Sequence, residues 1–498
     1  YSEDDRLVLV FNGEIYNYRS LTAELTALGH TFATRTDSEV VLHGWEQWGR
    51  ELLPRLRGMC AFALWDRRAD TLVCARDMFG IKPLYYCRCA DGTFLFGSEI
   101  KAFLDHPSFE KRLNAAQLPL YLSCQYSPGG DTFFAGVQKL LPGHFRTFSD
   151  GIVRTTRWVQ PAFVPGDAPA SPAEIEAVLR GSVEAHKIAD VEVAGFLSGG
   201  VDSGLLTALA MPQRSYTISY AEPKDDESFP AQALARNLGI RNRVRRISPG
   251  EFWDAVPAVQ YHMDEPLADA AAVALYFLNR EAAKEVKVCL SGEGADELFG
   301  GYNIYRDPFT LRWYDRLPPW LRGGLGAAAS LLPPAPGVNF LVRRGLPLEE
   351  RYFGPTALLT EREKRRLLAE YDGDGDPMFL TESVWDSTEG LDPVTRMQQV
   401  DLQLWLAGDI LLKADKMSMA HSLELRVPVL DREVFALAAA LPAAAKADAR
   451  FTKIALRQAA ARHLPAANAV RKKLGFPVPV RDWLRQEPYT SRVRAVFS

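Results

Sequence analysis

Short runs of apolar residues alternate with polar turns over the first 160 residues of the chain. Runs of this length, bounded by turn residues, are typical of β-strands. The pattern predicts strands at 7–11, 61–66, 71–77, 84–88 and 93–97. Two helical stretches, at 18–28 and 38–48, interrupt the strands. Many strands with few helices indicate an α+β domain with a layered architecture.

The pattern changes near residue 173, where predicted strands and helices begin to alternate. Strands are expected at 191–197, 214–220, 243–247 and 286–290, with helices between them. This order is typical of an α/β doubly wound parallel sheet, which binds ligands at the carboxyl ends of its strands. The chain after about residue 310 is predicted to be mainly helical, with an interruption rich in Gly, Pro and Ala at 323–338.

The segment 161–172 is rich in Pro, Ala and Gly and separates the two patterns. It predicts a boundary between a domain at 1–160 and a domain at 173–498. A chain of 498 residues is long enough for both.

Composition narrows the classes of protein to consider. The 58 basic and 62 acidic residues give a net charge of −4, which argues against a general nucleic-acid binder. No uninterrupted apolar run reaches the length of a membrane span. Six cysteines without a Cys-x-x-Cys pair favour reduced thiols, and hence a cytoplasmic protein.

The most informative segment is a small-residue loop between a predicted strand and a predicted helix. It contains Ser198, Gly199, Gly200, Asp202 and Ser203. Backbone N–H groups at such a helix N-terminus bind anions, and the glycines allow a phosphate to approach. A carboxylate beside a phosphate requires a cation between them, so Asp202 predicts Mg²⁺. The loop lacks the lysine of a P-loop and resembles the pyrophosphate loop of the ATP pyrophosphatases.

A second loop, at 291–302, follows the strand predicted at 286–290. It holds four glycines and three carboxylates, of which Glu293 and Asp296 matter most here. Carboxylates this close raise one another's pKa unless a cation is present. Asp296 is therefore predicted to join Asp202 in a Mg²⁺ site on the phosphates of ATP. A solvated acidic turn is the alternative interpretation.

Together, the two loops resemble those of the glutamine-dependent asparagine synthetases. Further segments that resemble the same family lie at 12–17, 76–86, 97–99, 261–266, 417–428 and 471–476. The resemblance covers nearly the whole chain. It implies an N-terminal-nucleophile hydrolase-like glutamine amidotransferase domain, followed by an ATP-dependent synthetase domain.

The resemblance also implies a reaction. Aspartate attacks ATP to give β-aspartyl-AMP and pyrophosphate, and ammonia from glutamine then converts the adenylate to asparagine and AMP. Glu293 matches a glutamate near the adenylate that can accept a proton from ammonia, and Lys453 matches the catalytic lysine. By itself, a lone helix lysine is usually a solvated charge.

Several other positions carry expectations from the family. The residues expected to hold adenosine are Leu197, Ile218, Ser291 and Gly292. Leu197 and Ile218 fit equally well as core residues. Arg426 and Asp431 fit a structural salt bridge at least as well as a substrate contact. The carboxylates expected near the amino group of aspartate are Asp264, Glu265 and Asp269.

The first domain matches half of a glutamine site. Asn12 and Gly13 match oxyanion-hole donors, and Glu14 and Asp37 match groups that hold the α-amino group of glutamine. Asp37 also fits the N-cap of a helix. The family's N-terminal cysteine nucleophile is missing from the sequence, which begins with Tyr1. Either the sequence is truncated, which its start within a predicted sheet favours, or the chain uses free ammonia.

Cys60 and Cys74 lie in apolar strand patterns and are expected to be buried instead of catalytic. Members of the family often form dimers, so a homodimer is a further expectation.

Three rival functions remain at this stage. A β-lactam synthetase tends to carry tyrosine where this chain has Glu293, so Glu293 favours asparagine synthesis. Another ATP-dependent amidotransferase acting on a different carboxylate stays open. A non-catalytic protein with the same fold is disfavoured by the joint presence of Asp202, Glu293, Asp296 and Lys453.

Overall fold

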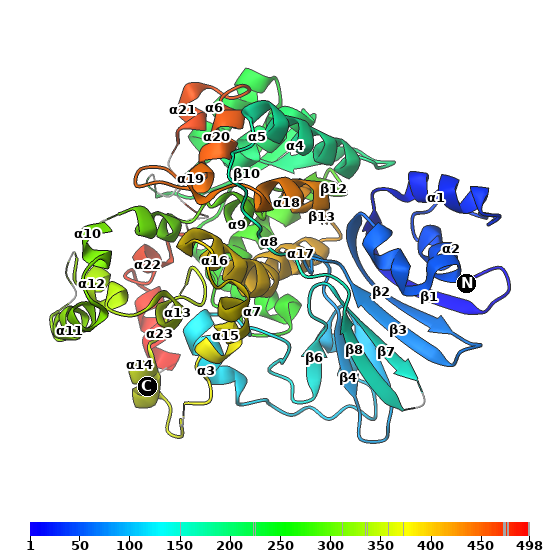
Figure 1. Cartoon of the computed structure of the whole chain (residues 1–498), viewed down its shortest axis with the longest axis horizontal. Helices are drawn as coiled ribbons and strands as arrows, with labels where there is room; N and C mark the ends of the chain where they lie inside the picture. Colours follow the sequence, from blue (N-terminus) through cyan, green and yellow to red (C-terminus); the bar gives the residue numbers. More distant parts are fainter. Residues whose placement is uncertain are drawn as a thin grey trace.

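The computed structural model describes residues 1–149, 151–222, 224, 226–310, 312–333, 335, 337–356, 358–371, 373–471, 475 and 478–496. The fold is mixed α/β, with antiparallel sheets in the first part and a parallel sheet in the second. Figure 1 shows the first part in blue and cyan, beside the green-to-red remainder of the chain. Among the described residues, every helix is too short or too polar to cross a lipid bilayer.

The first part contains two antiparallel sheets. The larger has the strand order β1-β2-β3-β7-β8 and the smaller β5-β4-β6. Their bounds are β1 Leu7–Ile15, β2 Gly58–Asp66, β3 Thr71–Arg76, β4 Tyr85–Arg88, β5 Phe94–Gly97, β6 Val137–Lys139, β7 His144–Ser149 and β8 Ile152–Arg157. The predicted strands are confirmed, while β6, β7 and β8 were not predicted.

Two helices cover the larger sheet, as the sequence predicts. These are α1 (Tyr18–Ala27) and α2 (Glu39–Trp48), followed by the short helix η1 (Gly49–Arg55). Leu21 and Leu25 of α1 pack in one apolar cluster with Phe62 and Leu64 of β2. Because alternate strand residues point to one face, this burial fixes the register of β1 against β2. Two further short helices are η2 (Ile100–Phe103) and α3 (Gln117–Cys124).

The parallel sheet has the order β11-β10-β9-β12-β13, and every neighbouring pair is parallel. Its strands are β9 Val193–Phe196, β10 Arg214–Ser219, β11 Arg241–Arg246, β12 Val288–Leu290 and β13 Glu424–Arg426. Along the chain, strands first add on one side of β9 and later on the other. The order therefore reverses between β9 and β12, which is the position where sheets of this kind bind ligands.

Apolar residues of this sheet divide between two clusters. One holds Leu197 and Leu290 together with residues of α4, α5 and α6, and the other holds Phe196 and Tyr216 with residues of α7, α8 and α17. The bounds are α4 Pro172–His186, α5 Val201–Ala210, α6 Ser228–Leu238, α7 Pro249–Met263, α8 Ala271–Ala282 and α17 Leu411–Met419.

The rest of the second part is mainly helical, as expected. Its elements are α9 Ala295–Phe299, η3 Asn303–Phe309, α10 Arg312–Asp315, α11 Pro319–Ala329, α12 Val338–Arg344, α13 Leu348–Arg351, α14 Glu361–Leu367, α15 Met378–Ser387, α16 Pro393–Val400, η4 Asp401–Ile410, η5 Pro428–Leu430, α18 Arg432–Ala439, α19 Ala443–Lys446, α20 Ile454–Ala460, α21 Ala466–Ala469, α22 Val480–Trp483 and α23 Tyr489–Val496.

The interruption predicted at 323–338 is wrong in its first part. Helix α11 continues through the glycines to Ala329. A Cβ atom on Gly326 would lie 3.1 Å from the Cα atom of Gly345, at the end of α12. The glycines therefore let α11 and α12 approach closely, and this packing offsets the low helix propensity of glycine.

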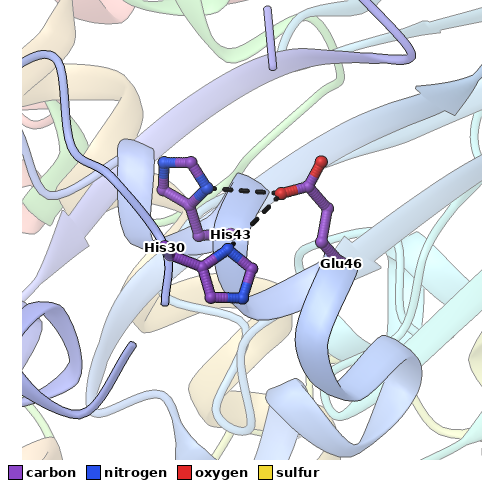
Figure 2. Close-up of side chains that lie close together, drawn as sticks. All are labelled: His30, His43 and Glu46. Atoms are coloured by element: carbon purple, nitrogen blue, oxygen red, sulfur yellow. Dashed lines mark hydrogen bonds and ion pairs between the residues drawn. The ribbon is translucent and has the colours of Figure 1, made fainter. Parts of the chain in front are cut away.

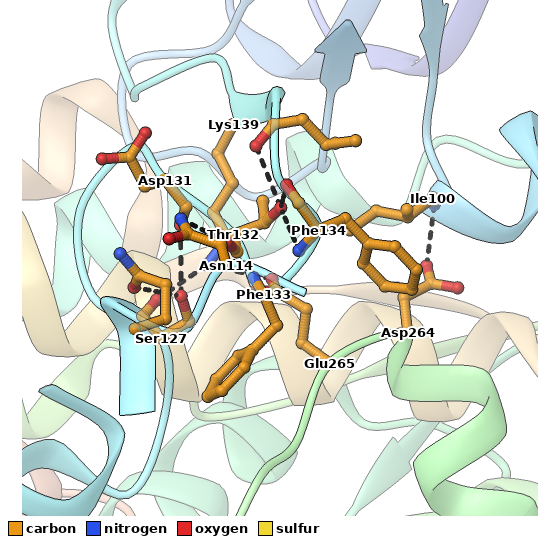
Figure 3. A network of polar contacts seen from close by, with 12 residues as sticks. Ile100, Asn114, Ser127, Asp131, Thr132, Phe133, Phe134, Lys139, Asp264 and Glu265 are labelled. Atoms are coloured by element: carbon orange, nitrogen blue, oxygen red, sulfur yellow. Dashed lines mark hydrogen bonds and ion pairs between the residues drawn. The ribbon is translucent and has the colours of Figure 1, made fainter. Parts of the chain in front are cut away.

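Buried ion pairs join the two parts of the chain. Asp264, which is 1% exposed at its side chain, lies 2.8 Å from Lys101 Nζ and 2.6 Å from Lys416 Nζ. Glu265 accepts a hydrogen bond from the backbone N–H of Phe133 and lies 3.1 Å from Lys139. Figure 3 shows Glu265 pointing towards Phe133 and Asp264 towards Ile100. Asp264 and Glu265 are thus interface residues, and their expected contact with aspartate stays a prediction.

Two further ion pairs lie in the same interface. Lys82 Nζ is 2.8 Å from Asp415, and both side chains are at least nine-tenths buried. Arg57 Nε is 2.7 Å from Asp431, so the structural interpretation of Asp431 is confirmed. Both of these pairs link a residue before 140 with a residue after 260.

Candidate active site

The first predicted loop connects β9 to α5. Gly200 is the N-cap residue of α5, and no side chain caps the helix, which leaves N–H groups of its first turn available to an anion. The hydroxyls of Ser198 and Ser203 lie 3.0 Å apart, and the N–H of Ser198 donates to Ser203 Oγ. These contacts hold the loop in a tight turn around the helix start.

Gly199 has a different role from the rest of this loop. Its φ of +75° lies in the left-handed region, and a Cβ atom there would be 2.7 Å from the backbone nitrogen of Ala231 in α6. Its carbonyl accepts a hydrogen bond from Asn468 Nδ2 at 3.1 Å. Gly199 therefore sets the path of the loop, and it does not line the cavity described below.

The second predicted loop follows β12 and contacts the first. A Cβ atom on Gly292 would lie 3.3 Å from the Cβ atom of Asp202. Asp296 is in the first turn of α9. The adjacent carboxyl ends of β9 and β12 thus bring the two loops together, as the sequence predicts.

Lys453 joins the two loops. Its Nζ atom lies 2.7 Å from Asp296 Oδ1 and forms an ion pair with Asp202. The side chain is 1% exposed, and burial lowers the pKa of Lys453 although Asp202 counteracts the effect. Its backbone adopts a left-handed conformation with φ of +55°, which is uncommon for a residue with a side chain and is often found at functional sites. Lys453 is therefore not a solvated helix lysine.

Both loops and Lys453 face one cavity of about 310 Å³. The predicted residues that line it are Leu197, Ser198, Gly200, Asp202, Ser203, Ile218, Ser291, Gly292, Glu293, Asp296 and Lys453. Leu197 and Ile218 are 2% and 9% exposed, so each serves the core and the cavity wall together. Asp269 also lines the cavity, unlike Asp264 and Glu265.

The sequence did not single out Lys413, which lines the same cavity, or its partner Asp409. Lys413 Nζ lies 2.5 Å from Asp269 and 2.6 Å from Asp409. Asp409 and Lys413 are four residues apart, on the π-helix η4 and the α-helix α17 that continues it. Wide helical turns of this type are frequent at functional sites. The signal in the sequence is a charged pair with i,i+4 spacing inside an apolar stretch.

Glu297 is a second carboxylate that the sequence analysis left without a role. Burial raises the pKa of Glu297 to about 7. The hydroxyl of Tyr302 donates a hydrogen bond to its Oε1 atom at 2.5 Å. Because both residues line the cavity, the second loop itself contributes a carboxyl group with a pKa near neutral to the cavity wall.

The carboxylates present fit a magnesium ion. Asp202 Oδ1 is buried and accepts no hydrogen bond from any described residue, while Asp202 Oδ2 faces Lys453. Oxygen ligands from one or two carboxylates are typical of Mg²⁺ that binds together with phosphates. Asp202 and Asp296 are the carboxylates that would hold such an ion.

The residues that are predicted to bind glutamine lie on β1 near its C-terminal end, or contact that strand. Asn12 Nδ2 donates a hydrogen bond to Ser98 Oγ at 3.1 Å. Gly13 pairs with Cys60 in the sheet, and a Cβ atom on Gly13 would overlap the carbonyl oxygen of Met59. Asp37 Oδ2 accepts a hydrogen bond from the N–H of Ile15 at 2.8 Å, so Asp37 is tied to β1.

Glu14 connects this region to the parallel sheet. Its carboxylate lies 3.3 Å from the guanidinium of Arg426, on β13. Burial raises the pKa of Glu14 to about 7, although Arg426 acts in the opposite direction. Arg426 also lies 2.6 Å from Glu424, which agrees with a structural interpretation of Arg426.

All six cysteines are buried and none forms a disulfide. Burial raises the pKa of Cys74 to about 12 and that of Cys60 well above its usual range. Neither thiol is activated as a nucleophile, as the sequence analysis expected.

Comparison with known proteins agrees with this arrangement. The asparagine synthase family matches residues 174–498, and the glutamine amidotransferase domain matches residues 1–159. The chain belongs to the asparagine synthase family.

Two bacterial relatives illustrate the similarity. One is a putative asparagine synthetase (glutamine-hydrolyzing) of Mycobacterium tuberculosis, which is 46% identical over 97% of this chain and 76% of its own length. The other is asparagine synthetase (glutamine-hydrolyzing) 1 of Bacillus subtilis, which is 40% identical over 97% of this chain and 78% of its own length.

Proposed function

We propose that this protein is a glutamine-hydrolysing asparagine synthetase, a carbon–nitrogen ligase whose substrates are aspartate, glutamine and ATP. One observation carries the proposal. The loop after β9, the loop after β12 and Lys453 converge on a single cavity at the switch point of the parallel sheet. Family membership and relatives of that name support this function over the rival carboxylate amidotransferases and β-lactam synthetases.

In the first step, a side-chain oxygen of aspartate attacks the α-phosphorus of ATP. The bond to the bridging oxygen breaks, and pyrophosphate leaves with the electron pair. Lys453 and the N-terminus of α5 stabilise the negative charge that develops on the phosphates. Mg²⁺ on Asp202 and Asp296 would neutralise part of the same charge.

The remaining residues of the cavity position the nucleotide. Leu197, Ile218, Ser291 and Gly292 form the wall assigned to adenosine. The residues assigned to the phosphates are Ser198, Gly199, Gly200, Asp202 and Ser203. Gly199 acts indirectly, because its backbone sets the turn against α6.

In the second step, ammonia attacks the carbonyl carbon of the adenylate, and AMP leaves. Ammonia must lose a proton as the C–N bond forms, and Glu293 is assigned as the group that accepts it. Glu293 lines the same cavity as Lys453 and lies within 3.5 Å of Ser291 Oγ. In the first part of the chain, Asn12 and Gly13 are assigned as oxyanion donors for glutamine, with Glu14 and Asp37 on its α-amino group.

We also propose that the chain is divided into two domains. A layered glutamine amidotransferase domain would comprise residues 1–160, and a doubly wound synthetase domain residues 173–498. The separate family matches and the two sets of sheets support this division. Buried thiols without disulfides support a reducing compartment such as the cytoplasm.

An assay of pyrophosphate release tests the proposed function. With ATP, Mg²⁺ and ammonium as the nitrogen source, release is expected to require aspartate and to be accompanied by equal amounts of AMP and asparagine. Ammonium makes the assay independent of glutamine hydrolysis. Release that proceeds with another carboxylic acid and not with aspartate would contradict the assigned substrate.

The Asp202→Asn variant tests the magnesium site. It keeps an oxygen ligand but loses a charge, so the Mg²⁺ concentration that gives half-maximal activity is expected to rise by about 10- to 100-fold. Activity is measured across a Mg²⁺ titration, with Asp254→Asn as the control because Asp254 is exposed. An unchanged Mg²⁺ requirement in Asp202→Asn would remove Asp202 from the site.

Glutamine binding is expected to depend on the charge of Glu14. Because the pKa of Glu14 is raised to about 7, its carboxylate is mostly protonated at pH 6 and mostly ionised at pH 8. Only the ionised form attracts the α-ammonium group, so glutamine affinity should increase about 10-fold over this interval. Equilibrium dialysis with labelled glutamine measures the change. Glu14→Gln should abolish the pH dependence, and the exposed control Glu110→Gln should retain it.

A further inference from the structure

A cluster of two histidines and one glutamate lies outside both sites described above. His30 is in the segment that connects α1 to α2, while His43 and Glu46 are on α2. His43 is 2% exposed, and the side chains of His30 and Glu46 are 17% and 19% exposed. In Figure 2, one nitrogen of each imidazole ring points to the same oxygen of Glu46.

The distances within the cluster suit a metal ion. Glu46 Oε2 lies 3.3 Å from His43 Nδ1 and 3.7 Å from His30 Nδ1. One candidate ligand atom from each residue falls within 4.8 Å of the others. Two ligands each about 2.1 Å from a tetrahedral Zn²⁺ ion are about 3.4 Å apart. Only small movements would therefore place the three atoms around one ion.

The far sides of both rings face oxygen atoms. His30 Nε2 is within hydrogen-bond distance of Gln47 Oε1, at 3.1 Å, while His43 Nε2 is 3.5 Å from Glu39 Oε1 and makes no hydrogen bond with a described residue. Metal-bound histidines nearly always direct their other ring nitrogen to such an acceptor. His43 Nδ1 lies within hydrogen-bond distance of Glu46 Oε2, so a metal ion bound there would displace the proton between these two atoms and leave the N–H of the ring at Nε2.

We propose that His30, His43 and Glu46 form a binding site for one divalent transition-metal ion of the Zn²⁺ type. Two imidazole nitrogens and one carboxylate oxygen are ligands that Zn²⁺ favours, and water would complete the coordination. This set of donors differs from the all-oxygen pair Asp202 and Asp296, which suits Mg²⁺. The two sites therefore select different ions.

Such an ion would link the segment between α1 and α2 to helix α2 itself. At present Glu39 holds this connection through the backbone N–H groups of Ala33 and Thr34, each at 2.7 Å. The metal would add a second attachment through His30. The same connection carries Asp37, whose carboxylate bonds to β1. The ion would thus stabilise the position of Asp37 and take no part in chemistry.

Metal analysis of the full chain without a histidine tag tests the site. The protein is dialysed against a small molar excess of Zn²⁺ with a large excess of Mg²⁺ and then against zinc-free buffer, and bound zinc is measured by elemental analysis. One zinc per chain is expected, and Co²⁺ in its place should give the visible absorption of a four-coordinate ion. Zinc should also raise the midpoint of thermal unfolding, because it binds only the folded state.

Substitutions at the two partly exposed ligands identify the residues involved. His30→Gln and Glu46→Gln should each weaken zinc binding at least about 10-fold and remove the Co²⁺ absorption. His43 is avoided because its burial makes unfolding a competing explanation. Two matched controls outside the cluster, His106→Gln and Glu51→Gln, should bind zinc normally. Absence of bound zinc in the unsubstituted chain, or full binding in both ligand variants, would overturn the proposal.

Discussion

Replacement of Lys453 by methionine is expected to reduce aspartate-dependent pyrophosphate release by about 100- to 1,000-fold, the range typical of removing one preorganised group that stabilises a transition state. Lys453 is the cation that contacts both loops, through Asp202 and Asp296. Methionine keeps most of the apolar stem in its buried position and removes only the charge. The rate is measured with saturating ATP, aspartate and ammonium, so that binding of glutamine does not enter the result.

Two controls separate this effect from loss of structure. The exposed Lys111→Met variant loses the same charge and should retain full activity. The midpoint of thermal unfolding of Lys453→Met shows whether the fold persists. A folded Lys453→Met variant with a normal rate would exclude Lys453 from the reaction and leave the ion pairs with Asp202 and Asp296 as purely structural contacts.

The largest effect on stability is expected at Asp264. Its Asp264→Asn variant leaves Lys101 and Lys416 facing an uncharged side chain in the interface between the two parts of the chain. Removing one member of a buried charged group typically costs about 3 to 5 kcal/mol, because the remaining charges stay buried without compensation. Chemical denaturation monitored by tryptophan fluorescence measures the free energy of unfolding. The exposed Asp105→Asn variant is the control and should change it little.

Asp264 should also make the free energy of unfolding depend on pH. Burial alone would raise the pKa of Asp264, but Lys416 and Lys101 outweigh it and hold the pKa below its ordinary value. A carboxylate with a lowered pKa in the folded state stabilises the protein above the unfolded pKa of about 4, and this contribution is lost as the pH falls further. The Asp264→Asn variant should lose less stability than the unsubstituted chain between pH 5 and the acid transition. An equal loss in both would contradict this role.

The candidate site was predictable because its main parts are local in sequence. The loops that contain Asp202 and Asp296 each follow a strand, and parallel strands place such loops on one edge. Lys453 needed the resemblance to a family, because a single lysine in a helix carries no pattern of its own. The structure shows that Lys453 is buried between the two carboxylates, which the spacing of residues in the sequence cannot reveal.

Features that depend on distant partners were not predictable. Asp264 and Glu265 lie within the segment 261–266 that resembles the family and look like substrate ligands, but their partners Lys101 and Lys139 lie more than a hundred residues away. The hairpin of β7 and β8 was missed for a local reason. Its outer strand β8 is mostly exposed and rich in Arg and Thr, so the apolar alternation that marks a strand is weak there.

The cluster of His30, His43 and Glu46 was predictable only in part. His43 and Glu46 are three residues apart on one helix, and that spacing places them on one face. His30 joins them only because the chain turns back after α1, and nothing in its sequence surroundings marks that position.

The buried pairs between the two parts of the chain bear on how the protein is handled in the laboratory. An N-terminal fragment that ends within 161–172 would lack the carboxylates that pair with Lys82, Lys101 and Lys139 in the complete chain. In either fragment, water would have to hydrate these charges and the surface around them. Neither fragment is therefore a reliable replacement for the complete chain in experiments. The segment 161–172 divides the sequence into two patterns, but cooperative folding is expected to include both sides of it.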